Sequence, residues 1–248
     1  MAREVKLSGR TAIVTGVENV LAAAVARRFV AAGARVVLVD TDRAAAGRLR
    51  AQLAPRETAA LAVSADLMTD AGWVEAISAC GNAFGPVDLL FNGVQAFRSV
   101  SIADVDAAEF GDLFDQVAVS AWLGQKHVIG AMRAGGQRGS IINLVSALAQ
   151  LGVPDCAALA AAARGVLMST KSAALECARD GAGIVVNALL VGRVDGDPLH
   201  FPGALALPDA RPVDPERVAA AALFLATDGA AYMTGAELAV DAGLTGLR

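Results

Sequence analysis

Short apolar runs rich in β-branched residues alternate along this chain with longer, alanine-rich stretches of helical periodicity. The short runs predict buried strands and the longer stretches predict helices. The strands are expected at Thr11–Thr15, Arg35–Asp40, Ala60–Val63, Asp88–Asn92, Gly139–Leu144, Gly183–Leu189 and Glu237–Val240. The helices are expected at Leu21–Ala32, Arg43–Leu53, 70–83, 109–134, 156–180 and 214–228.

Continuous apolar strands that alternate with helices indicate a parallel sheet covered on both faces. The fold class is therefore α/β, a single Rossmann-type doubly wound sheet with helices on both sides. No repeat, low-complexity tract or linker divides residues 1–248, so we expect one domain. The one long irregular stretch, from about Leu190 to Pro215, holds five of the eight prolines and is expected to overhang a ligand crevice.

Composition removes several classes of protein from consideration. The chain has 248 residues, 55% of them hydrophobic and 19% charged, which excludes a disordered, collagen-like or coiled-coil protein. A net charge of −4 argues against a nucleic-acid partner. No apolar run approaches the ~20 residues of a membrane span, and the N-terminus lacks a signal-like stretch. Cys80, Cys156 and Cys177 are scattered, which favours free thiols in a reducing cytoplasm over a disulfide scaffold or a zinc site.

The turn after the first strand has the position of a phosphate-binding loop without its chemistry. Such a loop needs glycines for a tight turn, for close approach to the pyrophosphate and for helix packing. Only Gly16 stands at a glycine position, while Val20 adds a branched side chain and Glu18 adds a negative charge near the helix start. Glu18 also has the simpler interpretation of a residue that caps or solvates the helix. Asp40 ends the second strand, where an acidic residue would hold an adenosine ribose.

Several segments together resemble the short-chain dehydrogenase/reductase family over the whole chain. They are Thr11–Gly16 (T-A-I-V-T-G), Ala65–Leu67 (A-D-L), Asp88–Asn92 (D-L-L-F-N), Gly139–Ser146 (G-S-I-I-N-L-V-S), Ile184–Ala188 (I-V-V-N-A) and Met233–Gly243, which contains the Thr234–Gly235 pair. The resemblance implies that Gly16, Asp40, Asp66 and Asn92 are remnants of a cofactor site. We expect this chain to bind no cofactor, because Val20, Glu18 and Gln95 would crowd or repel a bound dinucleotide.

In the family that this sequence resembles, a serine and a Tyr-x-x-x-Lys pair carry the chemistry, with an asparagine on the preceding helix. Ser146 stands at the serine position, but Leu159 and Ala163 stand at the tyrosine and lysine positions and Val117 at the asparagine position. The only tyrosine, Tyr232, precedes the last strand, so no other alignment supplies the acid. The catalytic set is therefore expected to be absent, with Ser146 a retained strand-end hydroxyl.

The remaining candidates for acid–base chemistry are few. His127 adjoins Lys126 on the long helix and is expected to be a packed or interface side chain, while His200 lies in the proline-rich stretch. Asp155 is interpreted as the N-cap of the following helix and Cys156 as a small buried residue. Two distant histidines make no ligand set, so no metal site is expected.

Three functions follow from this pattern. The first is a cytoplasmic subunit that is not an enzyme on its own and that assembles with an active paralogue, which binds the NAD. The resemblance implies assembly through the helices at 109–134 and 156–180, and the tail that ends in Arg248 could also reach a neighbour. The second is an oxidoreductase whose acid–base groups have moved to Asp155, Cys156 or His200. The third is a regulatory module that binds a nucleotide or acyl group without turnover.

Overall fold

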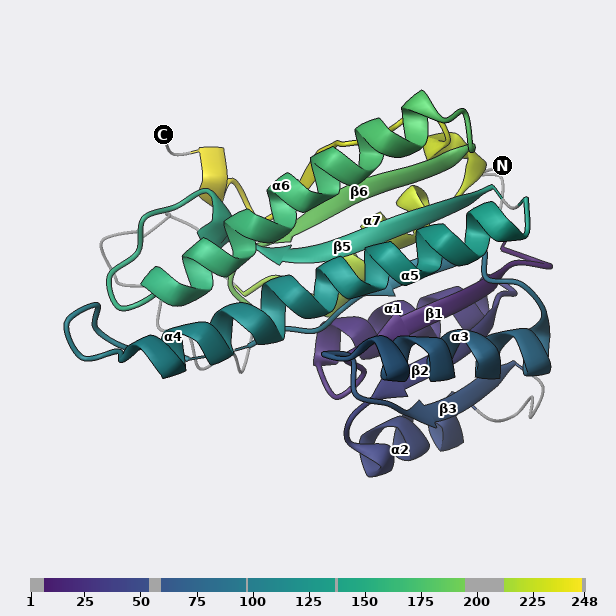
Figure 1. Cartoon of the computed structure of the whole chain (residues 1–248), viewed down its shortest axis with the longest axis horizontal. Helices are drawn as coiled ribbons and strands as arrows, with labels where there is room; N and C mark the ends of the chain where they lie inside the picture. The colour runs from purple at the N-terminus through teal and green to yellow at the C-terminus, as the bar shows by residue number, and fades with distance from the viewer. Residues whose placement is uncertain (1–6, 54–58, 97, 137, 195–211, 247–248) are drawn as a thin grey trace.

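Seven strands of the described residues form one parallel sheet in the order β3-β2-β1-β4-β5-β6-β7 (Figure 1). The computed structural model describes residues 7–53, 59–96, 98–136, 138–194 and 212–246. The strands are β1 (Thr11–Thr15), β2 (Arg35–Asp40), β3 (Ala60–Ser64), β4 (Leu89–Asn92), β5 (Gly139–Ser146), β6 (Ile184–Val191) and β7 (Glu237–Val240). The α-helices are α1 (Val20–Ala31), α2 (Arg43–Leu53), α3 (Asp70–Phe84), α4 (Ala107–Phe114), α5 (Ser120–Ala134), α6 (Ala157–Arg179) and α7 (Pro215–Leu225).

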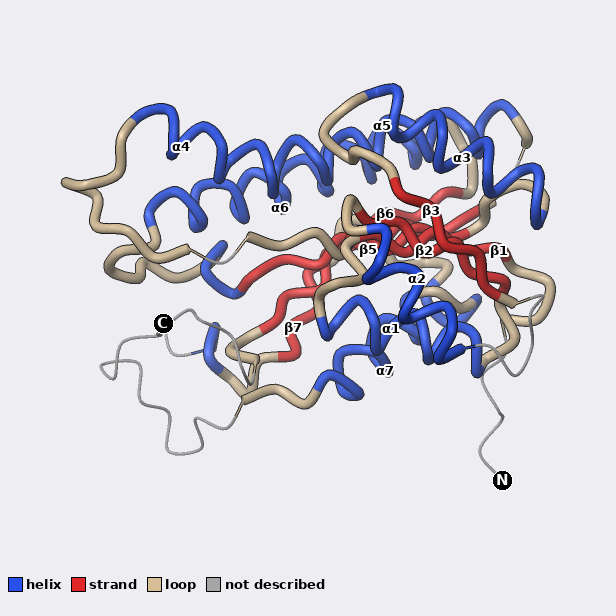
Figure 2. The backbone as a smooth tube through the Cα atoms, turned by 90° about the horizontal axis from the view of Figure 1, so that it is seen from below, coloured by secondary structure: helices blue, strands red, loops and turns tan. Residues whose placement is uncertain are grey.

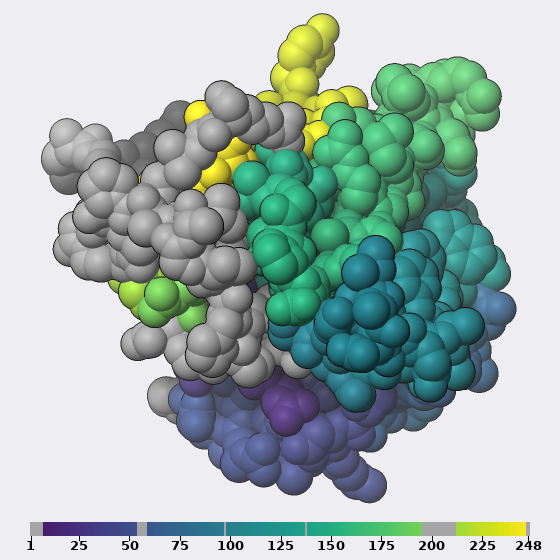
Figure 3. Space-filling view, turned by 90° about the vertical axis from the view of Figure 1, so that its left-hand side faces the viewer, coloured from purple at the N-terminus to yellow at the C-terminus, as the bar shows by residue number. Residues whose placement is uncertain are grey.

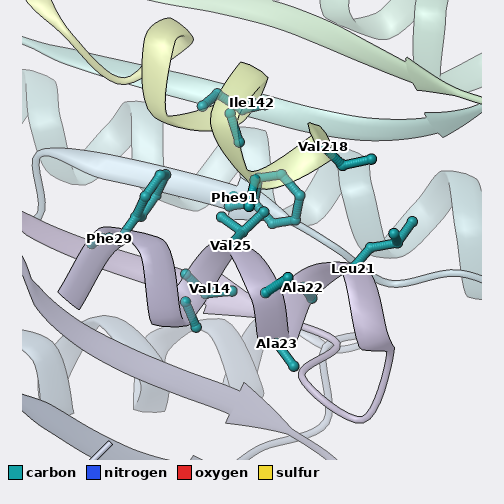
Figure 4. Close-up of a cluster of buried hydrophobic side chains, with 14 of the residues drawn as sticks. Val14, Leu21, Ala22, Ala23, Val25, Phe29, Phe91, Ile142 and Val218 are labelled. Atoms are coloured by element: carbon teal, nitrogen blue, oxygen red, sulfur yellow. The ribbon is translucent and has the colours of Figure 1, made fainter. Parts of the chain in front are cut away.

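Helices cover both faces of the sheet, as the continuous apolar strands predict (Figure 2). Successive side chains of a strand point to opposite faces, so Val14 packs among α1 and α7 whereas Ile13 packs with Trp73 on the α3 side. Figure 4 shows the first of these cores, where Val25 of α1 lies close to Phe91 of β4. The predicted doubly wound α/β fold is confirmed.

The helix expected at 109–134 is present and contains one irregular turn. The chain forms α4, then a π-helical turn at Asp115–Val119, and then α5, with no break between them. A π turn inserts one residue into a helix and changes which side chains face inward. Here the neighbours Val117 and Ala118 are both buried in one cluster with Val166 of α6. The prediction of a helix is confirmed, but periodicity alone did not reveal the inserted residue.

A chain of buried amides connects the middle of the sheet to α6. The Nδ2 atom of Asn92 donates to Oδ1 of Asn143 at 2.7 Å, and Nδ2 of Asn143 donates to Oγ1 of Thr170 at 2.8 Å. All three side chains are buried. Buried polar groups are costly unless they are hydrogen-bonded, so this chain fixes β4, β5 and α6 relative to one another. Asn92, expected as a remnant of a cofactor site, has its side-chain amide in this network.

Strand β7 lies at one edge of the sheet, and an ion pair between Glu237 and Lys171 joins it to α6. This ion pair should make the stability of the fold depend on pH. The Nζ atom of Lys171 on α6 lies 2.5 Å from Oε1 of Glu237, and Gln150 donates to the other carboxylate oxygen. The hydrogen bond from Lys171 is the main cause that lowers the pKa of Glu237 below its ordinary value of 4.5. The pair therefore stabilises the fold fully above that ordinary value, and the stabilisation disappears as the pH falls through the lowered pKa.

We expect Glu237→Gln to reduce the free energy of unfolding at pH 7 by about 0.2–1 kcal/mol, because both partners are partly exposed and screened. Urea unfolding at pH 7 and at pH 3 measures this, and the difference between wild type and variant should shrink at the lower pH. An equal difference at both values would show that the ion pair is not its cause.

The three cysteines are buried, and no disulfide joins them. Burial raises the pKa of the Cys80 thiol to about 11 and also raises the pKa of Cys177. Since the thiolate is the reactive form, we expect almost no reaction of the folded protein with Ellman's reagent at pH 8, and three thiols per chain after denaturation. Rapid reaction of the folded protein would contradict this packing.

Among the described residues, no helix has the length and apolar character to span a membrane.

Candidate functional site

A cleft lies where the strand order of the sheet reverses, between β1 and β4. In a doubly wound sheet this is the usual position of a ligand, beyond the carboxyl ends of the strands. The cavity measures about 620 Å³, within the range of small-molecule sites. It is lined by Gly16, Glu18, Asn19, Asp40, Thr41, Asp66, Leu67, Met68, Val94, Gln95, Gln116 and Ser120.

The first turn uses its own backbone amides internally. Gly16 has φ +66°, and a Cβ there would lie 2.8 Å from the backbone of Gly93, so this position requires glycine. Asn19 is the N-cap of α1 and accepts from the amide of Leu21 at 2.8 Å. Glu18 is therefore not the cap; its amide donates to Oδ2 of Asp40 at 2.9 Å instead. Two amides of the turn are thus committed to side chains of this chain rather than directed at a phosphate.

Two carboxylates remain on the side of the cleft that the family pattern assigns to adenosine. Asp40 is only 5% exposed, and its oxygens accept from the amides of Glu18 and Asp42 at 2.9 and 3.0 Å. Asp66 accepts from the amide of Met68 at 2.9 Å. Each carboxylate has capacity for further hydrogen bonds, and both residues line the cavity. Asp40 and Asp66 thus offer acceptor oxygens in this part of the cleft.

Gln95 separates that part from the end of β5. Its Nε2 atom donates to the carbonyl of Val94 at 3.0 Å and to the carbonyl of Leu144 at 3.1 Å. Gln95 also lines a second cavity of about 20 Å³ next to Ser146, which has room for roughly one water. Gln95 therefore lines both cavities and lies between them at the strand ends.

Apolar packing occupies the remaining positions of the family's catalytic set. Leu159 is 3% exposed and packs with Leu113, Leu148 and Val153, and Ala163 is 2% exposed and lies in one cluster with Val117. The side chains of Leu159, Ala163 and Val117 cannot exchange a proton. Ser146 ends β5 and its Oγ accepts from the amide of Leu148 at 3.2 Å, capping a short 3₁₀ helix. Ala163 and Val117 share one cluster with Val145, and Leu159 shares another with Leu148, so these side chains pack with near neighbours of Ser146 in the chain.

The other candidates lie elsewhere. Nε2 of His127 lies 2.6 Å from Oδ1 of Asp70, so this histidine links α5 to α3. Asp155 does not cap α6; it has φ +60°, and its carbonyl accepts from the amide of Val100. Cys156 is the N-cap residue and is buried as expected, although its side chain makes no capping bond. Tyr232 is fully exposed.

His200 and Arg248 lie outside the described residues. Among the residues that the structure describes, no three His, Cys, Asp or Glu side chains form a metal-binding group.

Sequence reasoning missed two residues that shape the cleft. The capping role of Asn19 could have been recognised, because an asparagine directly before an apolar helical run is a common N-cap signal. Gln116 lies within the π turn that precedes α5 and lines the cleft. No sequence signal marks it, because its placement depends on that irregular turn.

Comparison with known proteins agrees with this fold. Residues 16–245 match the model of a family described as enoyl-(acyl carrier protein) reductase. The chain is 31% identical to trans-4-hydroxycyclohexanecarboxylate dehydrogenase of Sinomonas cyclohexanicum, over 97% of this chain and 94% of that protein. It is 33% identical to galactitol 2-dehydrogenase (L-tagatose-forming) of Cereibacter sphaeroides, over 97% and 96%. It is also 33% identical to a protein named inactive 2-(S)-hydroxypropyl-CoM dehydrogenase 2 of Xanthobacter autotrophicus, over 90% and 100%.

The chain belongs to the short-chain dehydrogenase/reductase family of oxidoreductases. These relatives contradict one prediction from the sequence, that the chain is not an enzyme on its own. Most of the similar proteins are named as dehydrogenases and one is named inactive, so the comparisons point to an enzyme. Leucine, alanine and valine at the family's catalytic positions exclude the usual acid, but they leave Ser146 and the adenosine side of the cleft in place.

Proposed function

We propose that this chain is an oxidoreductase that interconverts a hydroxyl and a carbonyl group, with Ser146 holding the substrate oxygen. The observation that carries the proposal is the position of Ser146, at the end of β5 beside a water-sized cavity at the strand ends. Its Oγ already accepts from the amide of Leu148, which leaves its own O–H free to donate to a substrate oxygen. A nicotinamide nucleotide, when bound, would exchange the hydride.

The proton in this reaction passes to or from water instead of a tyrosine. Leu159 and Ala163 offer no titratable group, so in the oxidation a water beside the substrate oxygen accepts the hydroxyl proton while the hydride leaves, and in the reduction it returns the proton. General acid–base catalysis contributes roughly 10²–10⁴ in rate. Turnover is therefore slow, and it depends on how the oxygen is positioned rather than on a tuned acid.

The experiment that tests this function measures nicotinamide-dependent turnover of the purified chain with 4-hydroxycyclohexanecarboxylate and galactitol, the compounds named in the relatives. We expect slow turnover of at least one such hydroxyl compound, with kcat/KM lowered about tenfold or more by Ser146→Ala, since one lost hydrogen bond to a polar substrate costs about 1–2 kcal/mol. Ser169→Ala on α6, away from the cleft, serves as the control. Equal kcat/KM in wild type and Ser146→Ala would refute the role of Ser146.

A second candidate function is work in an assembly with a paralogue that retains the tyrosine and lysine and binds the NAD. The observation in its favour is a set of exposed apolar side chains on α5 and α6, two long helices that cover the same face of the sheet (Figure 1). Trp122 on α5 and Met168 on α6 are each about half exposed, and Leu175 on α6 is 71% exposed. Apolar side chains on a helix pair favour burial against a partner. The compartment of such an assembly is the cytoplasm, where free thiols persist.

The substrate we propose for that assembly is a hydroxyacyl-CoA thioester, with 2-[hydroxy(phenyl)methyl]succinyl-CoA of anaerobic toluene breakdown as the compound to test. Co-expression with a neighbouring paralogue followed by mass measurement tests the assembly. Met168→Glu should dissociate it, because an unpaired buried charge costs several kcal/mol, whereas Val74→Glu on α3, at a similarly exposed position, should not. A monomer in wild type, or equal effects of both variants, would exclude the α5–α6 surface.

A further inference from the structure

Strand β3 is an edge of the sheet, and a groove runs along its outer side. Among the described residues β3 pairs only with β2. The groove measures about 490 Å³ and lies between α2 on one face of the sheet and α3 on the other. Its lining consists of Arg43, Ala46, Gly47 and Arg50 of α2, Leu61, Ala62, Val63 and Ser64 at β3, and Glu75 and Ala79 of α3.

The backbone of β3 offers unused hydrogen-bonding groups to this groove. The amide of Val36 donates to the carbonyl of Ala59, and the amide of Ala65 donates to the carbonyl of Asp40. Along a strand, the backbone N–H and C=O groups of successive residues point alternately toward one neighbouring strand and toward the other side. The amides and carbonyls of Leu61 and Val63 therefore face β2, and those of Ala60, Ala62 and Ser64 face the groove.

Nothing in the strand's own sequence protects this edge. Edge strands are commonly shielded by charged side chains, prolines or bulges, because an open edge is a template for further pairing. Strand β3 reads A-L-A-V-S, with no charge and no proline, and its register with β2 is continuous from Ala60 to Ser64. An unprotected edge beside a groove is the arrangement that proteins use when an extended peptide adds a strand to a sheet.

The charges around the groove indicate what such a peptide carries. Arg43 and Arg50 line the α2 side, and among the described residues neither has a carboxylate within ion-pair distance. On the α3 side the one charged lining residue is Glu75, which would repel an acidic side chain, while Leu61 and Ala79 pack with the apolar core of that face. An added strand directs successive side chains to opposite faces, so acidic residues would reach α2 and apolar residues would reach α3.

We propose that this groove binds an extended acidic segment of a partner protein, which joins the sheet as a strand beside β3. A second copy of this chain fits less well, because pairing of two β3 edges would bring the arginines of both copies together. A free anion would use the arginines and leave the strand edge unpaired. The segment alternates acidic and apolar residues, with the acidic ones facing Arg43 and Arg50. This site is separate from the cleft and does not depend on the proposed reaction.

The test uses a fluorescent peptide of about seven residues, a common strand length, that alternates glutamate and valine. We expect saturable binding to the full chain by fluorescence anisotropy, weakened about tenfold or more by Arg43→Glu with Arg50→Glu, since charge-assisted hydrogen bonds are the strong ones. Arg48→Glu, on the same helix but outside the groove lining, is the matched control. A lysine–valine peptide should bind weakly.

Ala62→Pro tests the strand pairing separately. Its amide faces the groove and not β2, so proline there removes a donor to the peptide while the ladder to β2 stays intact. We expect loss of peptide binding with an unchanged circular dichroism spectrum and melting temperature. Absence of saturable binding in wild type would overturn the proposal, as would equal weakening by Arg48→Glu. If a folded Ala62→Pro variant still bound the peptide fully, the peptide would be held by ion pairs alone, and the proposal of an added strand would be refuted.

Discussion

Replacing Leu159 with tyrosine and Ala163 with lysine should raise kcat for the oxidation of a hydroxyl substrate by about 10²–10⁴, the usual contribution of general acid–base catalysis. Both positions lie on α6 four residues apart, on one face of the helix. Leu159 and Ala163 are buried beside Ser146's end of the sheet. A tyrosine hydroxyl near the Ser146 hydroxyl would supply a proton donor, and the lysine charge would favour its ionised form.

The new side chains must displace part of an apolar cluster, so stability is measured alongside activity. Inserting larger groups into a packed core typically costs about 1–3 kcal/mol, and the melting temperature should fall accordingly. Leu159→Phe with Ala163→Met adds similar volume without a titratable group and serves as the control. The tyrosine–lysine variant alone should gain rate and a new pH dependence of kcat. An equal gain in both variants would show that relaxed packing, not proton transfer, raises the rate.

The sheet was predictable because its signal is local. Buried strands such as Arg35–Asp40 are continuous apolar runs, and their parallel order follows from the helices between them. Strands β5 and β6 run two residues beyond the predicted Leu144 and Leu189, because their ends pair with each other, Ser146 opposite Val191. Such an extension is decided by the neighbouring strand, which local patterns do not contain.

The cleft was predictable in its positions and not in its contacts. The sequence placed Gly16 and Asp40 at strand ends, and the structure brings both to one cavity. It also placed Leu159 and Ala163 at the family's tyrosine and lysine positions, and these lie in apolar clusters. The bond from Gln95 to the carbonyl of Leu144 joins residues 49 apart in the chain, and no pattern in either segment reports it.

The chemical role of the chain was predicted less well than its fold. The missing tyrosine suggested a protein without its own activity, whereas most of the relatives are named as dehydrogenases. The position of the only tyrosine excludes proton transfer by the tyrosine–lysine pair. It does not exclude proton transfer by another group. Ser146 and Asp40 persist at their strand ends, and an account of function has to start from what those groups can do.

The sequence also predicts weak cofactor binding, and we expect Gln95 to be the main obstacle. Gln95 lines both the 620 Å³ cavity at Asp40 and the 20 Å³ cavity at Ser146. Its two hydrogen bonds to backbone carbonyls fix it across the strand ends. We therefore expect calorimetry of the wild-type chain to show no saturable binding of NAD below about 1 mM, which corresponds to a binding free energy weaker than about −4 kcal/mol.

Gln95→Gly should lower the dissociation constant for NAD about tenfold or more, because it removes both the bulk and the two bonds that separate the cavities. Gln95→Leu is the matched control, since leucine keeps most of the bulk and should bind NAD as weakly as wild type. Adenosine, which needs only the side of the cleft at Asp40 and Asp66, should bind all three proteins equally and lose affinity with Asp40→Asn. Micromolar NAD affinity in wild type would contradict the obstruction. An equal gain in NAD affinity from Gln95→Leu would show that the hydrogen bonds of Gln95, and not its bulk, weaken NAD binding. A gain in adenosine affinity with Gln95→Gly would show that the two cavities do not bind independently.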